Sequence, residues 1–199
     1  MPTVIIEHPP IAAPLDPPRK RWTREECEVM VKSGLDIERW ELIDGDLISR
    51  MSKNRPHVNV TAFLAAWLYR IFGFDFVLQE APINVAAFDN PTNEPEPDLC
   101  ILRMPYREFR TSNPGPADLH LVIEISDSTL DFDLRTKAQI YARAGIIEYW
   151  VVDVNRQRLI VHRDPSAGAY KSITEYAGSE QVTPLAAPQS ALTVESIFS

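Results

Sequence analysis

The feature that most constrains this chain is a glutamate inside an otherwise apolar run. Residues 119–125 (LHLVIEI) are typical of a strand buried on both faces at the centre of a sheet. Glu124 lies inside that run, and a carboxylate is costly to bury without an ionic partner or a metal ion. Two interpretations remain open. Glu124 is either a strand-end acid that meets solvent or an arginine, or it is part of a functional site.

A second acid heads another apolar run. Asp98 follows Pro97 and precedes residues 99–102 (LCIL). An aspartate after proline is often only a turn or cap residue. If the two runs are neighbouring strands, however, Asp98 and Glu124 converge on one hard cation. Carboxylate oxygens select Mg²⁺, Mn²⁺ or Ca²⁺ over softer metals.

Lys137 is the third candidate, in the first turns of the helix predicted after Glu124. The core-facing side of that helix is marked by Leu134, Ile140, Tyr141 and Ala144. A lysine here is usually a solvated surface residue, but Lys137 lies one turn from Tyr141 on a similar face. Its ammonium would then point back toward the strand ends. Beside a metal-bound water it would orient the nucleophile or stabilise charge on a scissile phosphate.

Two further residues are weighed for the site. Glu41, beside Trp40 on a predicted strand, is as consistent with a surface cross-strand partner as with a role around the metal. His57 follows Pro56 at a predicted helix start, where histidine is more often a surface or capping residue than a catalyst. We therefore leave His57 out of the predicted site.

The pattern of elements predicts an α/β fold with a central mixed sheet flanked by helices. Four helices are predicted. The first covers residues 24–33 and is opened by the capping box of Thr23 and Glu26, and the second runs from Pro56 to Gly73. The third runs from residue 131 or 133 to residue 144, and a short terminal helix is opened by Thr193 and Glu195. The predicted strands are a hairpin over residues 40–48 with an Asp-Gly turn, and residues 74–80, 83–87, 98–102, 119–125, 149–154, 159–163 and 170–176.

Composition narrows the class of protein. No apolar run is long enough to cross a bilayer, and residues 1–18 lack the pattern of a signal peptide. The two cysteines, Cys27 and Cys100, are far apart, which disfavours a zinc site or disulfide scaffold and suggests a reducing cytoplasm. The net charge of −8 argues mildly against a large non-specific phosphate-binding surface. Basic residues could still gather on one face, and the candidates are Arg103, Arg107, Arg110, Arg135 and Arg143.

The N-terminal segment differs from the rest of the chain. Six of the 17 prolines fall within residues 1–18, and proline neither continues helices nor donates to a strand ladder. We interpret residues 1–20 as a Pro-rich arm, extended or disordered. Residues 21–199 then form the folded domain.

Several of these motifs together resemble a bacterial restriction endonuclease family, abundant in cyanobacteria and long catalogued as a domain of unknown function. It belongs to the PD-(D/E)XK nuclease superfamily. The matching segments are residues 22–26 (WTREE), 41–46 (ELIDGD), 94–99 (EPEPDL), 121–128 (LVIEISDS), 133–137 (DLRTK), 141–146 (YARAGI) and 148–153 (EYWVVD).

The resemblance implies a restriction-endonuclease-like core over residues 21–199. Asp98 would match the motif aspartate and Glu124 the second acid, binding a divalent metal with the backbone carbonyl of Ile125. Glu41 would match the acid from the N-terminal part of the core. The superfamily usually places its lysine two residues after the second acid, where this chain has Ser126. Lys137 would be a migrated lysine.

The resulting hypothesis is a Mg²⁺- or Mn²⁺-dependent endonuclease that hydrolyses DNA phosphodiester bonds with Asp98, Glu124 and Lys137. The alternative is a catalytically weak or inactive nuclease-fold module that binds nucleic acid or a partner protein, favoured by the acidic balance and the missing strand lysine. A homodimer fits either hypothesis, as does a cytoplasmic location. The sequence shows no GxGxxG, P-loop or HExxH motif for an unrelated small-molecule function.

Overall fold

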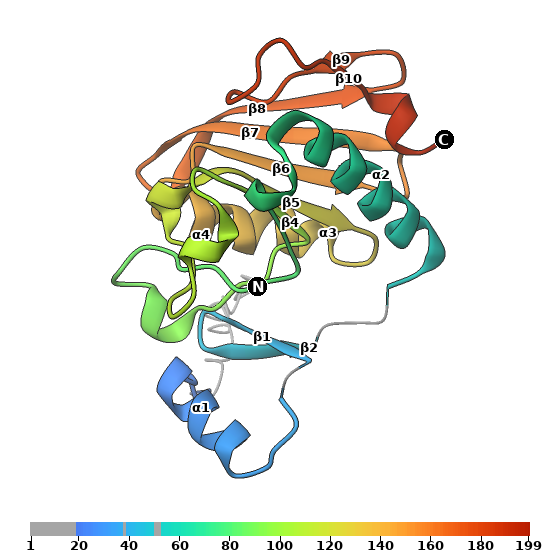
Figure 1. The fold of residues 1–199 in the computed structure, drawn as a ribbon. Helices are drawn as coiled ribbons and strands as arrows, with labels where there is room; N and C mark the ends of the chain where they lie inside the picture. The colour runs from blue at the N-terminus through green and yellow to red at the C-terminus, as the bar shows by residue number, and fades with distance from the viewer. Residues whose placement is uncertain (1–18, 38, 50–52) are drawn as a thin grey trace, which may run out of the picture.

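A computed structural model describes residues 19–37, 39–49 and 53–199 (Figure 1). Its centre is a mixed six-stranded sheet in the order β3-β4-β5-β6-β7-β8. The strands are β3 (Val77–Gln79), β4 (Leu99–Leu102), β5 (Leu119–Ser126), β6 (Glu148–Asp153), β7 (Arg158–Ser166) and β8 (Ala169–Ala177). Within this sheet β5 and β6 are parallel, and the other neighbouring pairs are antiparallel. The predicted mixed α/β architecture is confirmed.

Helices cover both faces of the sheet. One face packs against α2 (Arg55–Phe72) and the C-terminal segment, which contains β9 (Gln181–Val182), β10 (Leu192–Thr193) and the 3-10 turn η6 (Val194–Ile197). The other face packs against the continuous helical segment between β5 and β6. That segment consists of α3 (Leu130–Phe132), the π-helix η5 (Asp133–Lys137) and α4 (Ala138–Arg143). Because β5 and β6 are parallel, this segment is the crossover that joins them.

Strand β5 contributes side chains to both layers. Leu121, Ile123 and Ile125 belong to the core under α2, whereas Val122 belongs to the core under α4. Since side chains alternate along a strand, Glu124 shares the face of Val122 and points toward the layer that contains η5. Strand β4 runs antiparallel to β5 with Leu99 opposite Ile123. This register brings Asp98, at the start of β4, beside the end of β5.

A smaller unit lies beside this sheet, formed by α1 (Arg24–Lys32) and the hairpin of β1 (Trp40–Ile43) and β2 (Asp46–Ser49) (Figure 1). Both bonds of the predicted capping box open α1. In the hairpin turn Asp44 and Gly45 have φ of 48° and 80°, as a two-residue turn between strands requires. The hairpin joins the larger unit through the Glu94 amide, which donates to the Leu42 carbonyl at 2.7 Å.

Most predicted elements are confirmed, and two strand predictions need correction. Residues 74–76 form a 3-10 turn, η1 (Phe74–Phe76), because α2 ends at Gly73 with φ of 86°. Only residues 77–79 of the predicted strand 74–80 pair with β4. The predicted strand over residues 83–87 is wrong. Other groups bond its backbone: the Val85 amide donates to Asn90 Oδ1 at 2.8 Å, and the Ile83 carbonyl accepts from Arg24 at 3.3 Å.

The sequence prediction missed the two-residue strands β9 and β10 and the π-helix at residues 133–137. The predicted terminal helix is the single 3-10 turn η6. The predicted Pro-rich arm falls, except for Arg19 and Lys20, outside the described residues. Among the described residues, no helix combines the length and apolar character needed to cross a membrane.

Glu148 joins the sheet to the C-terminal segment. It is fully buried and accepts hydrogen bonds from Arg163, from the Trp150 indole at 3.0 Å and from the Leu185 amide at 2.8 Å. Removing one partner of a buried ion pair leaves the other charge uncompensated. We expect Glu148→Ala to lower the free energy of unfolding by about 3–5 kcal/mol in urea titrations.

A suitable control is Glu175→Ala, because Glu175 also pairs with an arginine, at 2.6 Å, but its side chain is 52% exposed. We expect a loss of less than about 1 kcal/mol there. Equal losses for the two variants would contradict the structural role of Glu148.

His162 makes stability depend on pH. Burial lowers its pKa to about 4, and its Nδ1 has no hydrogen-bond partner among the described residues. The unfolded chain takes up a proton below about pH 6.5, whereas the folded protein resists protonation until about pH 4. The contribution of His162 is therefore complete above pH 6.5 and declines as the pH falls toward 4. Urea titrations should show a shallower decline over this range for His162→Phe, and an identical slope would contradict the assignment.

Candidate active site

A polar pocket lies where the hairpin, the start of α2, the head of β4, the end of β5 and η5 meet. The acidic and lysine side chains that line it are six carboxylates and two lysines: Glu41, Glu96, Asp98, Glu124, Asp127, Asp133, Lys53 and Lys137. The structure thus brings the predicted residues Glu41, Asp98, Glu124, Ile125 and Lys137 into one place. Their assigned roles in metal binding and catalysis stay predictions.

Glu124 is not the solvent end of its strand. Its side chain is 6% exposed, and no arginine pairs with it among the described residues. Its Oε1 accepts from Lys137 Nζ and from the Tyr141 hydroxyl, both at 2.9 Å. Lys137 and Tyr141 are one helical turn apart, so both reach the same carboxylate oxygen.

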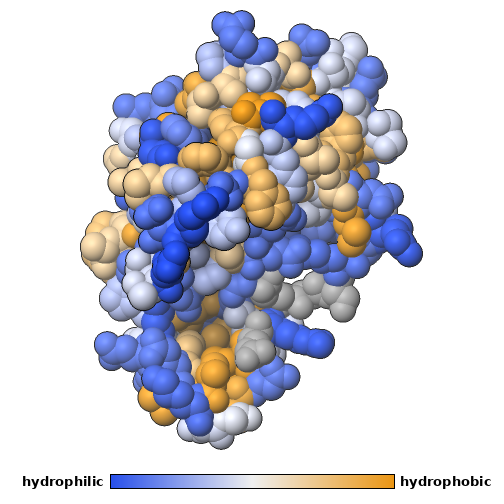
Figure 2. Space-filling model, in the orientation of Figure 1, coloured by the Kyte–Doolittle hydropathy of each residue, from blue (hydrophilic) through white to orange (hydrophobic). Residues whose placement is uncertain are grey.

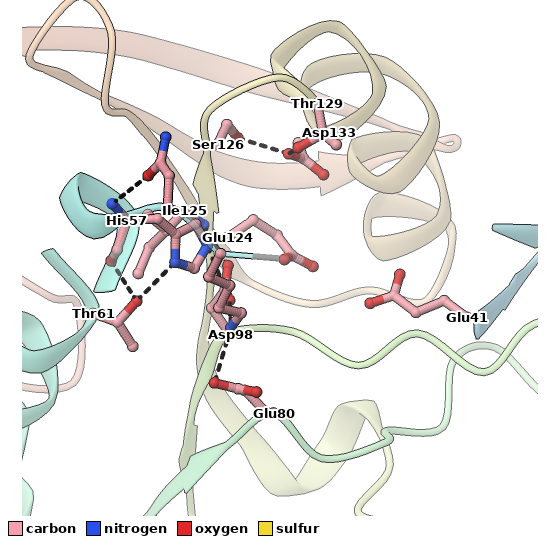
Figure 3. A network of polar contacts seen from close by, with 12 residues as sticks. Glu41, His57, Thr61, Glu80, Asp98, Glu124, Ile125, Ser126, Thr129 and Asp133 are labelled. Carbon is pink, nitrogen blue, oxygen red and sulfur yellow. Dashed lines mark hydrogen bonds and ion pairs between the residues drawn. The ribbon is translucent and has the colours of Figure 1, made fainter. Parts of the chain in front are cut away.

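Lys137 joins two acids from distant parts of the chain. Its Nζ lies 2.8 Å from Glu41 Oε2 on β1 and 2.9 Å from Glu124 Oε1 on β5, and its side chain is 7% exposed. Figure 3 shows the carboxylates of Glu41 and Glu124 pointing toward one another. The ammonium therefore ties the hairpin to the central sheet and faces the pocket rather than bulk solvent.

The π-helix η5 accounts for the direction of Lys137. Single π turns inside α-helices are common at functional sites. Here the π turn spans Asp133–Lys137, and both of its end residues are buried toward the sheet. Asp133 Oδ2 accepts from Ser126 Oγ and Thr129 Oγ1 at 2.7 Å each (Figure 3). Ser126, two residues after Glu124, thus holds the start of the helix segment that carries Lys137.

Asp98 is held from three sides. Its Oδ2 accepts from the Ile125 amide at 2.8 Å, which fixes β4 against β5 next to Glu124. Its Oδ1 lies 2.6 Å from Lys53 Nζ and 3.4 Å from His57 Nε2. Burial alone would raise the pKa of Asp98, but the hydrogen bond and charge of His57 and the charge of Lys53 lower it to about 2. Asp98 is therefore an anion at neutral pH.

Carboxylates outnumber lysines in the pocket. Burial raises the pKa of Glu124 well above its ordinary value; the Lys137 charge opposes this, while Asp133, Glu41 and Asp98 add to it. Burial also acts to lower the pKa of Lys137, but Glu124, Glu41 and Asp133 raise it, so the ammonium stays charged. The neighbouring carboxylates therefore disfavour the Glu124 anion, and a bound cation would offset that repulsion.

The donor set fits a hard cation. Asp98 and Glu124 offer carboxylate oxygens, and the Ile125 carbonyl belongs to the residue whose amide already binds Asp98. Among the described residues, no three His, Cys, Asp or Glu side chains are grouped closely enough to hold a metal ion by themselves. Mg²⁺ is usually held through one or two carboxylates and keeps several waters, so two carboxylates and one carbonyl suit it.

The sequence prediction missed Lys53, His57, Asp133 and Tyr141. His57 is buried, and its amide donates to Asn54 Oδ1 at 2.9 Å, which caps α2 and aims the first turn of α2 at Asp98. Asn54-Arg55-Pro56 was a visible cap signal for that helix start. Nothing in the sequence showed that this end of α2 meets β4, because the contact joins residues 41 positions apart.

Comparison with known proteins places this geometry in a family. The model of the Uma2 family, described as "Putative restriction endonuclease", matches residues 31–195. The chain belongs to the Uma2 family. The Uma2 match covers the hairpin, the pocket and the whole sheet. The sequence resemblance to a restriction endonuclease family is thereby confirmed.

A solved structure agrees on the fold of this Uma2 protein. The crystal structure of a "putative nuclease belonging to DUF820" from Anabaena variabilis matches with a TM-score of 0.63 and 13% sequence identity. The match covers 80% of this chain and 89% of the other. At this identity the match shows a shared fold. No protein in a search of curated sequences matched the chain.

The buried Lys137 ammonium should be important for stability without added metal. We expect Lys137→Met to lower the free energy of unfolding in EDTA by about 3–5 kcal/mol, because Glu41 and Glu124 lose their shared counter-charge. Lys32→Met is the matched control, since Lys32 pairs with Glu28 on the surface of α1 with a side chain 75% exposed. That change should cost about 0.5 kcal/mol or less. Similar losses in both variants would contradict the placement of Lys137.

Proposed function

We propose that this chain is a divalent-metal-dependent endonuclease that hydrolyses DNA phosphodiester bonds. The observation that carries the proposal is Lys137, whose buried ammonium lies 2.9 Å from Glu124 and 2.8 Å from Glu41 in the pocket that also contains Asp98. Two acids and a lysine in one pocket are the groups that the PD-(D/E)XK resemblance implies. Membership of the Uma2 family and the shared nuclease fold support the same reaction class.

Asp98, Glu124 and the Ile125 carbonyl would hold Mg²⁺ or Mn²⁺, with Glu41 at the edge of the site. A bound divalent cation supplies an activated water and stabilises charge on phosphate oxygens. The observation that fits a cation is the surplus of carboxylates around Glu124, which Lys137 offsets only in part.

The chain's own residues would position the reacting groups. The Ile125 amide, Lys53 and His57 fix the Asp98 carboxylate, and Tyr141 fixes that of Glu124. Lys137 would orient the attacking water or stabilise negative charge on the scissile phosphate. Such prepositioned charge acts most strongly in a pocket from which water is largely excluded.

A second function is a catalytically weak module on the same fold that binds nucleic acid or a partner protein. One observation favours it: Lys137 is already engaged by two carboxylates, and Ser126 occupies the usual lysine position and bonds Asp133 instead. In that case the lysine would serve the structure more than the reaction. A homodimer and a cytoplasmic location remain predictions under both functions.

Plasmid cleavage with Mg²⁺ or Mn²⁺ tests the first function. We expect nicking or linearisation by the wild type, and a loss of about a hundredfold or more in Asp98→Asn, Glu124→Gln and Lys137→Gln. These isosteric or near-isosteric changes keep the pocket filled. Circular dichroism of each variant is the control for folding. Glu28→Gln, on the exposed side of α1, is the control and should cleave like the wild type.

Equal cleavage by the wild type and the three variants would overturn the assigned site. Titration calorimetry separates the two functions further. Mg²⁺ or Mn²⁺ binding that disappears in Asp98→Asn supports a metal site, whereas DNA binding without turnover supports the non-catalytic module. Cleavage of RNA but not DNA would retain the chemistry and contradict the proposed substrate.

A further inference from the structure

We propose that an exposed aromatic and arginine surface, at the end of β3 and β4 remote from the pocket, binds unpaired nucleotides of the substrate strand. This stacking surface consists of Tyr69, Phe74 and Tyr106 with the arginines next to them in the chain, Arg70, Arg107 and Arg110. It lies on the end of α2, on η1 and on the 3-10 turn η3 (Tyr106–Glu108). The proposal rests on the proposed nuclease function and names a class of substrate for it.

The three rings form a connected group that solvent reaches. Phe74 is 65% exposed and Tyr106 is 42% exposed. The Phe74 ring lies 5.3 Å from Tyr69 and 6.2 Å from Tyr106, with the second pair edge to face. Figure 2 shows apolar and strongly hydrophilic side chains next to one another on the face of the molecule that is turned to the viewer. Large apolar groups exposed together mark binding sites more often than isolated ones do.

Polar contacts hold Tyr69 and the two turns that carry Phe74 and Tyr106. The Tyr69 hydroxyl bonds the Gln79 side chain, and Arg107 pairs with Asp75 across the two turns. Arg110 Nε donates to the Arg107 carbonyl at 3.3 Å. Prepositioned rings lose little conformational entropy when a base stacks on them, which favours binding.

Charge at the stacking surface is opposite to that of the whole chain. Residues 69–76 and 104–110 contain three arginines and two acids, whereas the chain as a whole has a net charge of −8. Arg107 pairs with Asp75, whereas Arg70 and Arg110 make no ion pair with any of the residues that the structure describes. Local positive charge around exposed rings fits a polyanion that carries aromatic bases, which is a nucleic-acid strand.

The stacking surface and the candidate active site lie at opposite ends of one short strand pair. Strand β3 leads from Phe76 to Glu80, and β4 leads from Asp98 to Arg103. The two strands are antiparallel, with Val77 opposite Ile101 and Gln79 opposite Leu99. Four residues of strand span roughly 13 Å. Because β3 is the edge of the sheet, a single strand laid along it would pass from the rings to Glu80, Lys53 and Asp98.

Unpaired rather than duplex nucleotides suit this surface. Rings exposed on surface turns can stack only on bases whose faces are free. In a duplex, the faces of each base are covered by the neighbouring bases. Base stacking tolerates any sequence, because every base has an aromatic face. The substrate class that follows is a strand with an unpaired segment next to the cleaved bond.

Binding can be measured apart from cleavage. Fluorescence anisotropy with labelled oligo(dT) of 15 nucleotides in EDTA should give saturable binding that is weakened about 5- to 150-fold by Phe74→Ala or Tyr106→Ala. Phe74→Trp should restore it, because a larger ring still stacks. Phe88→Ala is the matched control, since Phe88 is 72% exposed but lies outside the stacking surface. Each arginine-to-glutamine change should reduce the slope of log affinity against log salt concentration by about 0.7.

Three outcomes decide the proposal. Weaker oligo(dT) binding in Phe74→Ala, with duplex binding unchanged and Phe88→Ala like the wild type, supports it. No oligo(dT) binding by the wild type, or equal binding by Phe74→Ala, overturns it even if plasmid is cleaved. Oligo(dT) binding without cleavage in Mg²⁺ or Mn²⁺ contradicts the proposed function but still supports nucleotide binding by the stacking surface.

Discussion

The rest of the site depends on one buried ammonium shared by two carboxylates. Lys137 lies between Glu41 of the hairpin and Glu124 of the central sheet, so one contact both joins the two units and sets the charge of the pocket. Buried ion pairs are expensive to desolvate and add little stability compared with apolar packing. What the buried set provides is a fixed geometry, which the proposed phosphodiester hydrolysis would require.

The backbone around Lys137 is arranged to serve this contact. The π turn at Asp133–Lys137 directs both end residues to the sheet, and Ser126 and Thr129 bind Asp133 at the first end. The helix then continues to Tyr141, which reaches the same Glu124 oxygen as Lys137. A lysine carried by a helix can thus stand where a lysine on the strand would, provided the helix start is fixed.

The sequence predicted what depends on local pattern. The capping box of α1, the Asp-Gly hairpin and the apolar run around Glu124 each have a short-range signal, and each element forms. Contacts between distant segments had no such signal: Lys53 and His57 meet Asp98 only because α2 packs against β4. Residues 83–87 looked like a strand, but their backbone bonds the Arg24 and Asn90 side chains and the carbonyls of Pro95 and Pro114 instead.

The central claim is that Asp98 and Glu124 form one divalent-metal site served by Lys137. A crystal soaked in Mn²⁺ and measured at the manganese absorption edge tests it most directly, because anomalous scattering locates the ion without reference to activity. The account predicts a peak within about 2.5 Å of carboxylate oxygens of both Asp98 and Glu124, with Lys137 Nζ beside it. A peak elsewhere, or none at these carboxylates at saturating Mn²⁺, would contradict it.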